Sequence, residues 1–140
     1  MKFTLDITPS TVTAQEKKVC VVKGRPIFYD PPKVQTAKAE LMVHLHEHRP
    51  KEPIAGAVFL KVVWMFPKGR THKDGEWRTT RPDTDNLQKM LKDCMTYLGF
   101  WNDDAQVVAE YCEKVWSDEP TGISIEINKL PTLKEESHDS

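Results

Sequence analysis

The sequence has few cysteines, and their number and spacing do not fit a disulfide framework. Its 140 residues include only Cys20, Cys94 and Cys112, which is an odd number and forms no Cys-x-x-Cys motif. Cys20 lies in an apolar run and Cys94 on the apolar stripe of an expected helix, so we expect buried thiols in a reducing cytoplasm. A chain of this length can bury a core without disulfides or structural metals.

A long apolar segment is missing as well. No apolar run reaches the roughly 18 residues of a membrane-spanning helix. Residues 1–6 are not followed by the apolar core of a signal peptide. The sequence therefore predicts a cytoplasmic protein without a membrane span.

An excess of charge of one sign is also absent, because the net charge is only −1. The charges are nevertheless unevenly distributed. Residues 61–81 contain six Lys or Arg against Asp74 and Glu76, whereas residues 101–140 contain ten Asp or Glu against three Lys. This asymmetry favours a nucleic-acid partner, which the total charge does not reveal.

Hydrophobic periodicity predicts two helices, over residues 33–48 and 85–98, the second of which ends at Gly99. Alternating or β-branched runs predict strands at residues 2–8, 18–23, 57–66, 105–116 and 122–128. The chain has no repeat and no linker. It therefore predicts one α+β domain over residues 1–130, with a sheet of about four to six strands and two helices packed on it. Residues 131–140 are expected to form a polar tail.

Acidic side chains stand on both sides of the second expected helix. Asp83 and Asp85 precede it, and Asp103-Asp104 follows it. A helix of 14 residues is about 21 Å long. Asp104 can therefore join Asp83 and Asp85 only if the chain folds back after Gly99, along a strand antiparallel to the helix.

Carboxylates that meet in this way would suit magnesium, which prefers oxygen ligands and offsets the charge of a phosphodiester under attack. Lys89 lies four residues after Asp85 on the same helix face. It would stabilise the charge that builds on the phosphate oxygens. Asp83, Asp85, Lys89 and Asp104 are the candidate catalytic residues.

The same residues also have structural interpretations. Asp85 with Gln88 fits a capping-box pair, Asp85, Lys89 and Asp93 fit ion pairs four residues apart, and Asp103-Asp104 fits a turn. A phosphatase of the haloacid dehalogenase type would carry its Asp-x-Asp after an apolar strand, and a calcium loop would need further acids and a glycine. Neither pattern is present. Spacing alone leaves a metal site and a helix cap with a turn both open.

The stretch DTDNLQKMLKDCMTYLGFWNDDAQV, residues 83–107, closely resembles the RusA family of Holliday junction resolvases. The shared pattern is D-x-D-N, a helix with a lysine, a glycine and then D-D-x-x-V/I. A shorter match at residues 23–26, KGRP, is similar to the family's N-terminal basic turn. The chain departs from the family at Cys94, where alanine is usual, and at Ile27, where many members have another arginine.

The resemblance implies a magnesium-dependent endodeoxyribonuclease, phage- or prophage-borne, that cuts four-way junctions and related branched DNA by paired symmetric nicks. Such a protein acts in DNA recombination, repair or phage DNA processing. The family's essential acids fall on Asp83, Asp85 and Asp104, which would hold Mg²⁺, and Mn²⁺ is expected to substitute. The catalytic lysine falls on Lys89. The resemblance also implies a mixed sheet and a homodimer, whose two sites match the near two-fold symmetry of a junction.

Basic side chains near these acids are the predicted DNA contacts, because they neutralise phosphates. They are Lys23, Arg25, Lys68, Arg70, Lys73, Arg78 and Arg81. Trp77 lies in the same basic loop, where it could stack on an exposed base or anchor the loop to the core. A zinc site at His44, His46 and His48 is not expected, since only His44 and His48 share a helix face.

Two other functions remain as alternatives. One is a non-catalytic, structure-selective DNA-binding protein on the same scaffold, and the other is a protein-interaction domain with an acidic rim. A binding protein has no reason to keep several negative charges facing phosphate. The retained acids therefore favour the nuclease.

Overall fold

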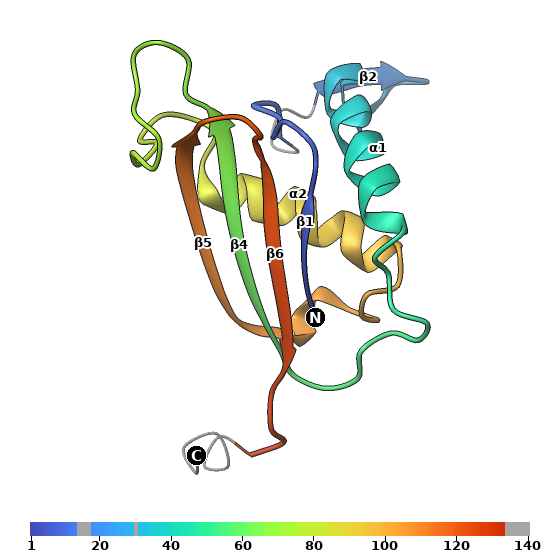
Figure 1. Cartoon of the computed structure of the whole chain (residues 1–140). Coiled ribbons are helices and arrows are strands. Elements are labelled where there is room, and N and C mark those ends of the chain that lie inside the picture. Colours follow the sequence, from blue (N-terminus) through green and yellow to red (C-terminus); the bar gives the residue numbers. More distant parts are fainter. Residues whose placement is uncertain (14–17, 30, 134–140) are drawn as a thin grey trace.

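Four strands form one mixed sheet in the order β1-β6-β4-β5 (Figure 1). The structure, a computed structural model, describes residues 1–13, 18–29 and 31–133. The strands are β1 Lys2–Leu5, β4 Val58–Pro67, β5 Val107–Ser117 and β6 Gly122–Lys129. β4 is parallel to β5 and antiparallel to β6, which is antiparallel to β1. The predicted α+β class with a mixed sheet and two helices is confirmed, while residues 134–140 of the expected tail lie outside the described residues.

Both helices pack on the same face of the sheet (Figure 1). They are α1 Pro32–His46 and α2 Thr84–Tyr97. Alternate residues of β4, including Leu60 and Trp64, are fully buried under the helices. On α2 the apolar stripe that includes Leu87 and Leu91 is also fully buried, and Gly99 follows the helix at φ 83°. No helix among the described residues is long and apolar enough to cross a membrane.

A separate hairpin joins β2 Lys18–Val22 and β3 Arg25–Tyr29 in antiparallel pairing. The turn residues Lys23 and Gly24 both have positive φ, which suits a tight hairpin turn. No strand is predicted at residues 25–29, where proline usually breaks one, yet Pro26 is paired within β3, since a two-stranded sheet has only edge strands and these tolerate proline. The predicted burial is wrong for Cys20, whose side chain is exposed on this hairpin, and correct for Cys94.

The basic segment between β4 and α2 is a loop, as the sequence predicts, but part of it is bonded to the sheet. Its residues 75–78 follow the outer edge of β5. Gly75 N donates to Trp116 O at 2.8 Å, Trp116 N donates to Glu76 O at 2.8 Å, and Arg78 N donates to Lys114 O at 3.0 Å. These backbone bonds hold the chain that leads to Asp83 against the sheet.

The chain does fold back after α2, as a strand following the helix requires. A short 3₁₀ helix, η1 Asp104–Gln106, comes between α2 and β5. β5 begins beside the start of β4, where Val58 pairs with Val107. β4, α2 and β5 therefore form a crossover that joins two parallel strands, with α2 lying across the face that β4 and β5 present.

Candidate active site

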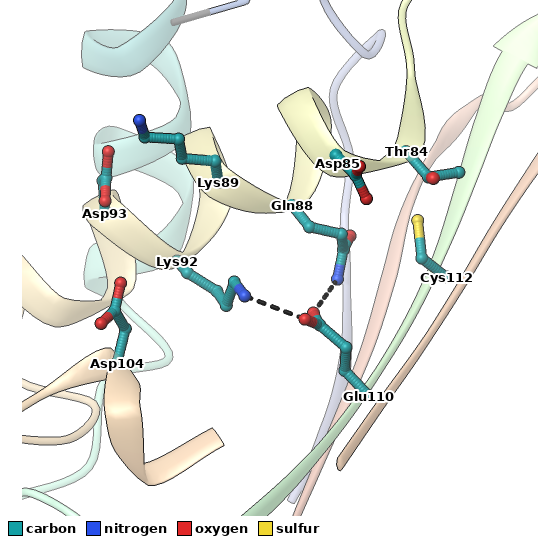
Figure 2. Close-up of a pocket in the computed structure, with 9 residues that line it drawn as sticks. All are labelled: Thr84, Asp85, Gln88, Lys89, Lys92, Asp93, Asp104, Glu110 and Cys112. Atoms are coloured by element: carbon teal, nitrogen blue, oxygen red, sulfur yellow. Dashed lines mark hydrogen bonds and ion pairs between the residues drawn. The ribbon is translucent and has the colours of Figure 1, made fainter. Parts of the chain in front are cut away.

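A polar pocket of about 560 Å³ lies between α2 and β5, with η1 at one end (Figure 2). Helix α2 supplies one wall and β5 supplies the other, and the lining includes both carboxylate and ammonium groups. The lining residues are Thr84, Asp85, Gln88, Lys89, Lys92, Asp93, Asp104, Glu110 and Cys112. Two of the three predicted acids and the predicted lysine thus share one pocket.

The polar side of α2 faces this pocket because its apolar stripe faces the sheet. Asp85, Lys89 and Asp93 are spaced four residues apart and line the opening, while Leu87 and Leu91 are buried. Asp85 lies in the first turn of the helix, where the positive end of the helix dipole favours a negative charge. The position that caps the helix is Asp83 and not Asp85, so the capping-box interpretation of Asp85 with Gln88 is wrong.

Asp83 lies beside the pocket at the start of α2, with an extended backbone at φ −71° and ψ 150°. Its carbonyl oxygen accepts from Leu87 N at 3.1 Å, as a capping residue's does. Its side chain makes no capping hydrogen bond. An Asp at this position normally uses its carboxylate to cap the helix, so the Asp83 carboxylate is left for another role.

The two adjacent acids after α2 have different environments. Asp103 Oδ1 accepts from Ala105 N at 2.9 Å, and Gln106 Oε1 accepts from Asp103 N at 3.1 Å, which is a capping box at the start of η1. Gln106 Nε2 also donates to Ile54 O at 2.8 Å. Asp104 instead lines the pocket. The turn interpretation thus holds for Asp103.

The predicted acids do not converge on a single point. Figure 2 shows Asp85 and Asp104 at opposite ends of the pocket. Within residues 1–13, 18–29 and 31–133, no three His, Cys, Asp or Glu side chains lie close enough to hold a metal ion. Magnesium usually takes one or two carboxylates and completes its shell with water and substrate phosphates. The hard oxygen donors of this pocket fit that ion without forming a closed cage.

Sequence reasoning missed a hydrogen-bond network at the centre of the pocket. Trp64 Nε1 donates to Gln88 Oε1 at 2.8 Å. Gln88 Nε2 donates to Glu110 Oε2 at 3.0 Å (Figure 2). Lys92 Nζ lies 2.9 Å from Glu110 Oε1. The available signal was the alternation of Glu110, Cys112 and Lys114 along a strand, which places three polar groups on the face toward the helix.

The surroundings shift the pKa values of two of these β5 side chains. Burial raises the pKa of the Cys112 thiol to about 12. Burial lowers the pKa of Lys114, as does repulsion from Arg78, while the charge of Asp83 opposes the change. Lys114 Nζ donates to Thr80 O at 2.8 Å and to Pro82 O at 2.7 Å.

Two of the predicted DNA-binding residues contact other side chains of the protein, and the other five are exposed. The Arg78 guanidinium lies over the rings of Phe66 and Trp116, with Cζ 4.2 Å and 4.5 Å from the centroids, and burial lowers its pKa. Lys68 Nζ lies 3.4 Å from Asp118 Oδ1. The exposed residues are Lys23, Arg25, Arg70, Lys73 and Arg81. In Figure 1 the hairpin and the basic segment project from the same end of the molecule.

Comparison with known proteins adds an independent result. The profile of a family described as Endodeoxyribonuclease RusA matches residues 9–128. The crossover junction endodeoxyribonuclease rusA of Lactococcus phage r1t is 37% identical over 131 residues, which cover 92% of this chain and 96% of that protein. The uncharacterized protein YqaN of Bacillus subtilis (strain 168) is 28% identical over 131 residues, which cover 86% and 90%.

Proposed function

The chain belongs to the RusA family of endodeoxyribonucleases, and from this premise we propose that it resolves four-way DNA junctions and related branched DNA in a magnesium-dependent reaction. The observation that carries the proposal is the pocket between α2 and β5, where Asp85, Lys89 and Asp104 face one space. The phage origin of one relative supports action on phage DNA in a bacterial cytoplasm.

Asp83, Asp85 and Asp104 would hold Mg²⁺ once a DNA phosphate enters the pocket and supplies further oxygen ligands. The bound ion offsets phosphate charge and makes a water more acidic. Asp83, Asp85 and Asp104 would position that ion against the scissile phosphate, which the carboxylates alone would repel. Mn²⁺, which also takes oxygen ligands, would substitute.

Lys89 lines the same pocket, one helical turn beyond Asp85. Its ammonium would lie against the non-bridging phosphate oxygens and stabilise the charge that accumulates on them in the transition state. Lys92 is held by Glu110 on the opposite wall, so its charge is already offset. Of the two lysines of this pocket, Lys89 is therefore the better candidate for this role.

DNA binding falls to the exposed basic residues of the hairpin turn and of the segment before α2. They would neutralise backbone phosphates and offset the repulsion between DNA and the acidic pocket. The residues that we propose for this role are Lys23, Arg25, Arg70, Lys73 and Arg81. Lys68 and Arg78 would assist chiefly by holding the segment in place.

We propose a homodimer as the acting form. Resolution needs two matched cuts, and a two-fold dimer presents two sites to two opposed strands. The test is a supercoiled plasmid that extrudes a cruciform. Paired cutting within one binding event gives linear product, whereas nicked circles alone would contradict the dimer.

A synthetic four-way junction tests the activity itself, beside a linear duplex of the same sequence. Symmetric nicks in the junction with Mg²⁺, absent with EDTA and absent in the duplex, support the proposal. Asp85→Asn should abolish cutting and leave binding equal or tighter, because it removes charge but keeps shape. If the wild-type protein binds the junction without cutting it, the result would support the alternative of a structure-selective DNA-binding protein. If it does not bind even at low salt, the result would support a protein-interaction domain.

A further inference from the structure

Three consecutive backbone carbonyls just before Asp83 are each held by a cationic side chain. Lys114 Nζ donates to Thr80 O at 2.8 Å and to Pro82 O at 2.7 Å. Arg78 Nη2 donates to the carbonyl oxygen between them, that of Arg81. Charged donors make stronger hydrogen bonds than neutral ones, so residues 80–82 are held more firmly than an ordinary connecting segment.

Lys114 reaches these carbonyls from a rigid position. It lies in the middle of β5, paired with Trp64 of the central strand β4. Its ammonium is partly buried, and two of its three N–H donors are engaged by the two carbonyls. The side chain is therefore committed to the protein backbone and not to a phosphate in solvent.

Arg78 is fixed by aromatic rings. Its guanidinium lies over Phe66 of β4 and Trp116 of β5, and His72 stacks on the same indole with ring centroids 4.0 Å apart. Arg78 N also donates to Lys114 O at 3.0 Å. The two cations thus come from neighbouring backbone positions and act on one peptide segment.

The segment that they hold ends at the first acid of the proposed site. Asp83 begins α2 without using its carboxylate as a cap. Its charge is close enough to Lys114 to stabilise the protonated form of that lysine. A helix start that is not closed by its own capping side chain needs another restraint, and the bonds to residues 80–82 supply one.

We propose that Lys114 and Arg78 are positioning residues that hold residues 80–82, so that Asp83 and Asp85 are presented in a fixed orientation to the metal and the scissile phosphate. The inference rests on the proposed function, because it gives the two acids their role. A displacement of a catalytic group by about 1 Å can lower a rate by about 100-fold. Holding the peptide is therefore a direct contribution to the rate.

Lys114→Met in the full chain tests the proposal with two readouts. The first is hydrogen exchange of the Arg78 and Leu87 amides, which flank the held segment and donate to Lys114 O and Asp83 O. Their exchange should become faster while exchange in β4 is unchanged. The second is single-turnover cutting of a four-way junction at saturating protein, which should fall by about 10- to 100-fold. Junction affinity in EDTA should change by less than about twofold, since Lys114 does not face DNA.

Lys129→Met is the matched control, because Lys129 is an exposed lysine at the end of β6. It should leave both readouts unchanged. Lys114→Arg should restore most of the rate and of the protection, since it keeps a charged donor. If Lys114→Met does not fold, Lys114→Gln carries the same test, because a single short amide cannot reach both carbonyls.

The proposal is overturned if Lys114→Met exchanges and cuts like the wild type, or if cutting falls while the Arg78 and Leu87 amides stay protected. It is also overturned if Lys114→Arg fails to restore either readout. Failure of the proposed function looks different: the wild-type protein would then not cut the junction at all, or Asp83→Asn and Asp85→Asn would cut like the wild type, whatever the exchange at Arg78 and Leu87.

Discussion

Gln88 donates a hydrogen bond from Nε2 to Glu110 Oε2 at 3.0 Å and so ties helix α2 to strand β5 across the pocket. Gln88 is buried, and its amide oxygen accepts from Trp64 Nε1 at 2.8 Å. Because Trp64 can only donate, the amide can point only one way. The orientation of Glu110 toward the pocket is thus set from within the core.

Gln88→Met should destabilise the protein by about 1–3 kcal/mol, because the buried indole N–H of Trp64 loses its acceptor. Urea unfolding measures the loss. The matched test is a double-mutant cycle with Trp64→Phe, which removes the donor. The double variant should cost at least about 0.5 kcal/mol less than the sum of the single variants. Strict additivity would show that the bond contributes nothing to stability.

Loss of a residue that hydrogen-bonds to a metal ligand lowers activity by roughly 10- to 100-fold. Asp104→Asn changes a proposed ligand itself, so it should lower the rate of junction cutting by more than that. Its neighbour provides the control. Asp103→Asn should cut within about threefold of wild type, since asparagine caps a helix as well as aspartate does. Rates are compared in single-turnover assays at fixed Mg²⁺. Equal effects of the two substitutions would contradict the assignment of Asp104 to the pocket.

Arg70→Gln should act on DNA binding, whereas Arg78→Gln should act on stability. Arg70 is exposed, so its loss should weaken binding to all DNA sequences and reduce the salt slope by about one. Arg78 lies on Phe66 and Trp116, so its loss should lower the melting temperature and change the salt slope little. A binding titration at several salt concentrations and a thermal melt separate the two. A salt slope reduced by about one for Arg78→Gln would show instead that Arg78 contacts phosphate.

Most of the fold was accessible from the sequence, because helix α2 and strand β4 bury regular apolar patterns at Leu87, Leu91 and Leu60. Strand β3 was missed because Pro26 indicates a break unless the strand lies at an edge. The pairing of residues 75–78 with β5 uses backbone groups, which carry no side-chain signature.

The site was predictable only in part. The resemblance of one continuous stretch selected the acids before and after α2 and Lys89 as candidates, of which Asp85, Lys89 and Asp104 line one pocket. The bonds from Gln88 to Glu110 and from Lys114 to Pro82 join residues 22 and 32 positions apart. Such contacts depend on the packing of α2 against β5 and not on any local pattern.

The cysteines should differ in their reaction with iodoacetamide at pH 8. Burial raises the pKa of Cys94 to about 11 and that of Cys112 to about 12. A raised thiol pKa keeps the group protonated at pH 8, and only the thiolate reacts. Cys20 is exposed, so mass spectrometry should find one rapid modification, at Cys20. Denatured protein, in which all three react, is the control, and rapid labelling of Cys112 would contradict the raised pKa of its thiol.

Trp77→Ala should weaken binding to four-way junctions more than binding to linear duplex. The Trp77 side chain is 61% exposed, although its backbone pairs with Val115 of β5. The indole is therefore presented to solvent by a held backbone, which suits stacking on a base that a junction leaves open. Stacking of a base on an aromatic side chain contributes about 1–3 kcal/mol, which corresponds to roughly 5- to 150-fold in junction affinity. Trp77→Phe should keep most of this preference because it keeps an aromatic face. Gel-shift titrations with matched junction and duplex give the ratio, and an equal loss on both substrates would show that Trp77 only supports the fold of the basic segment.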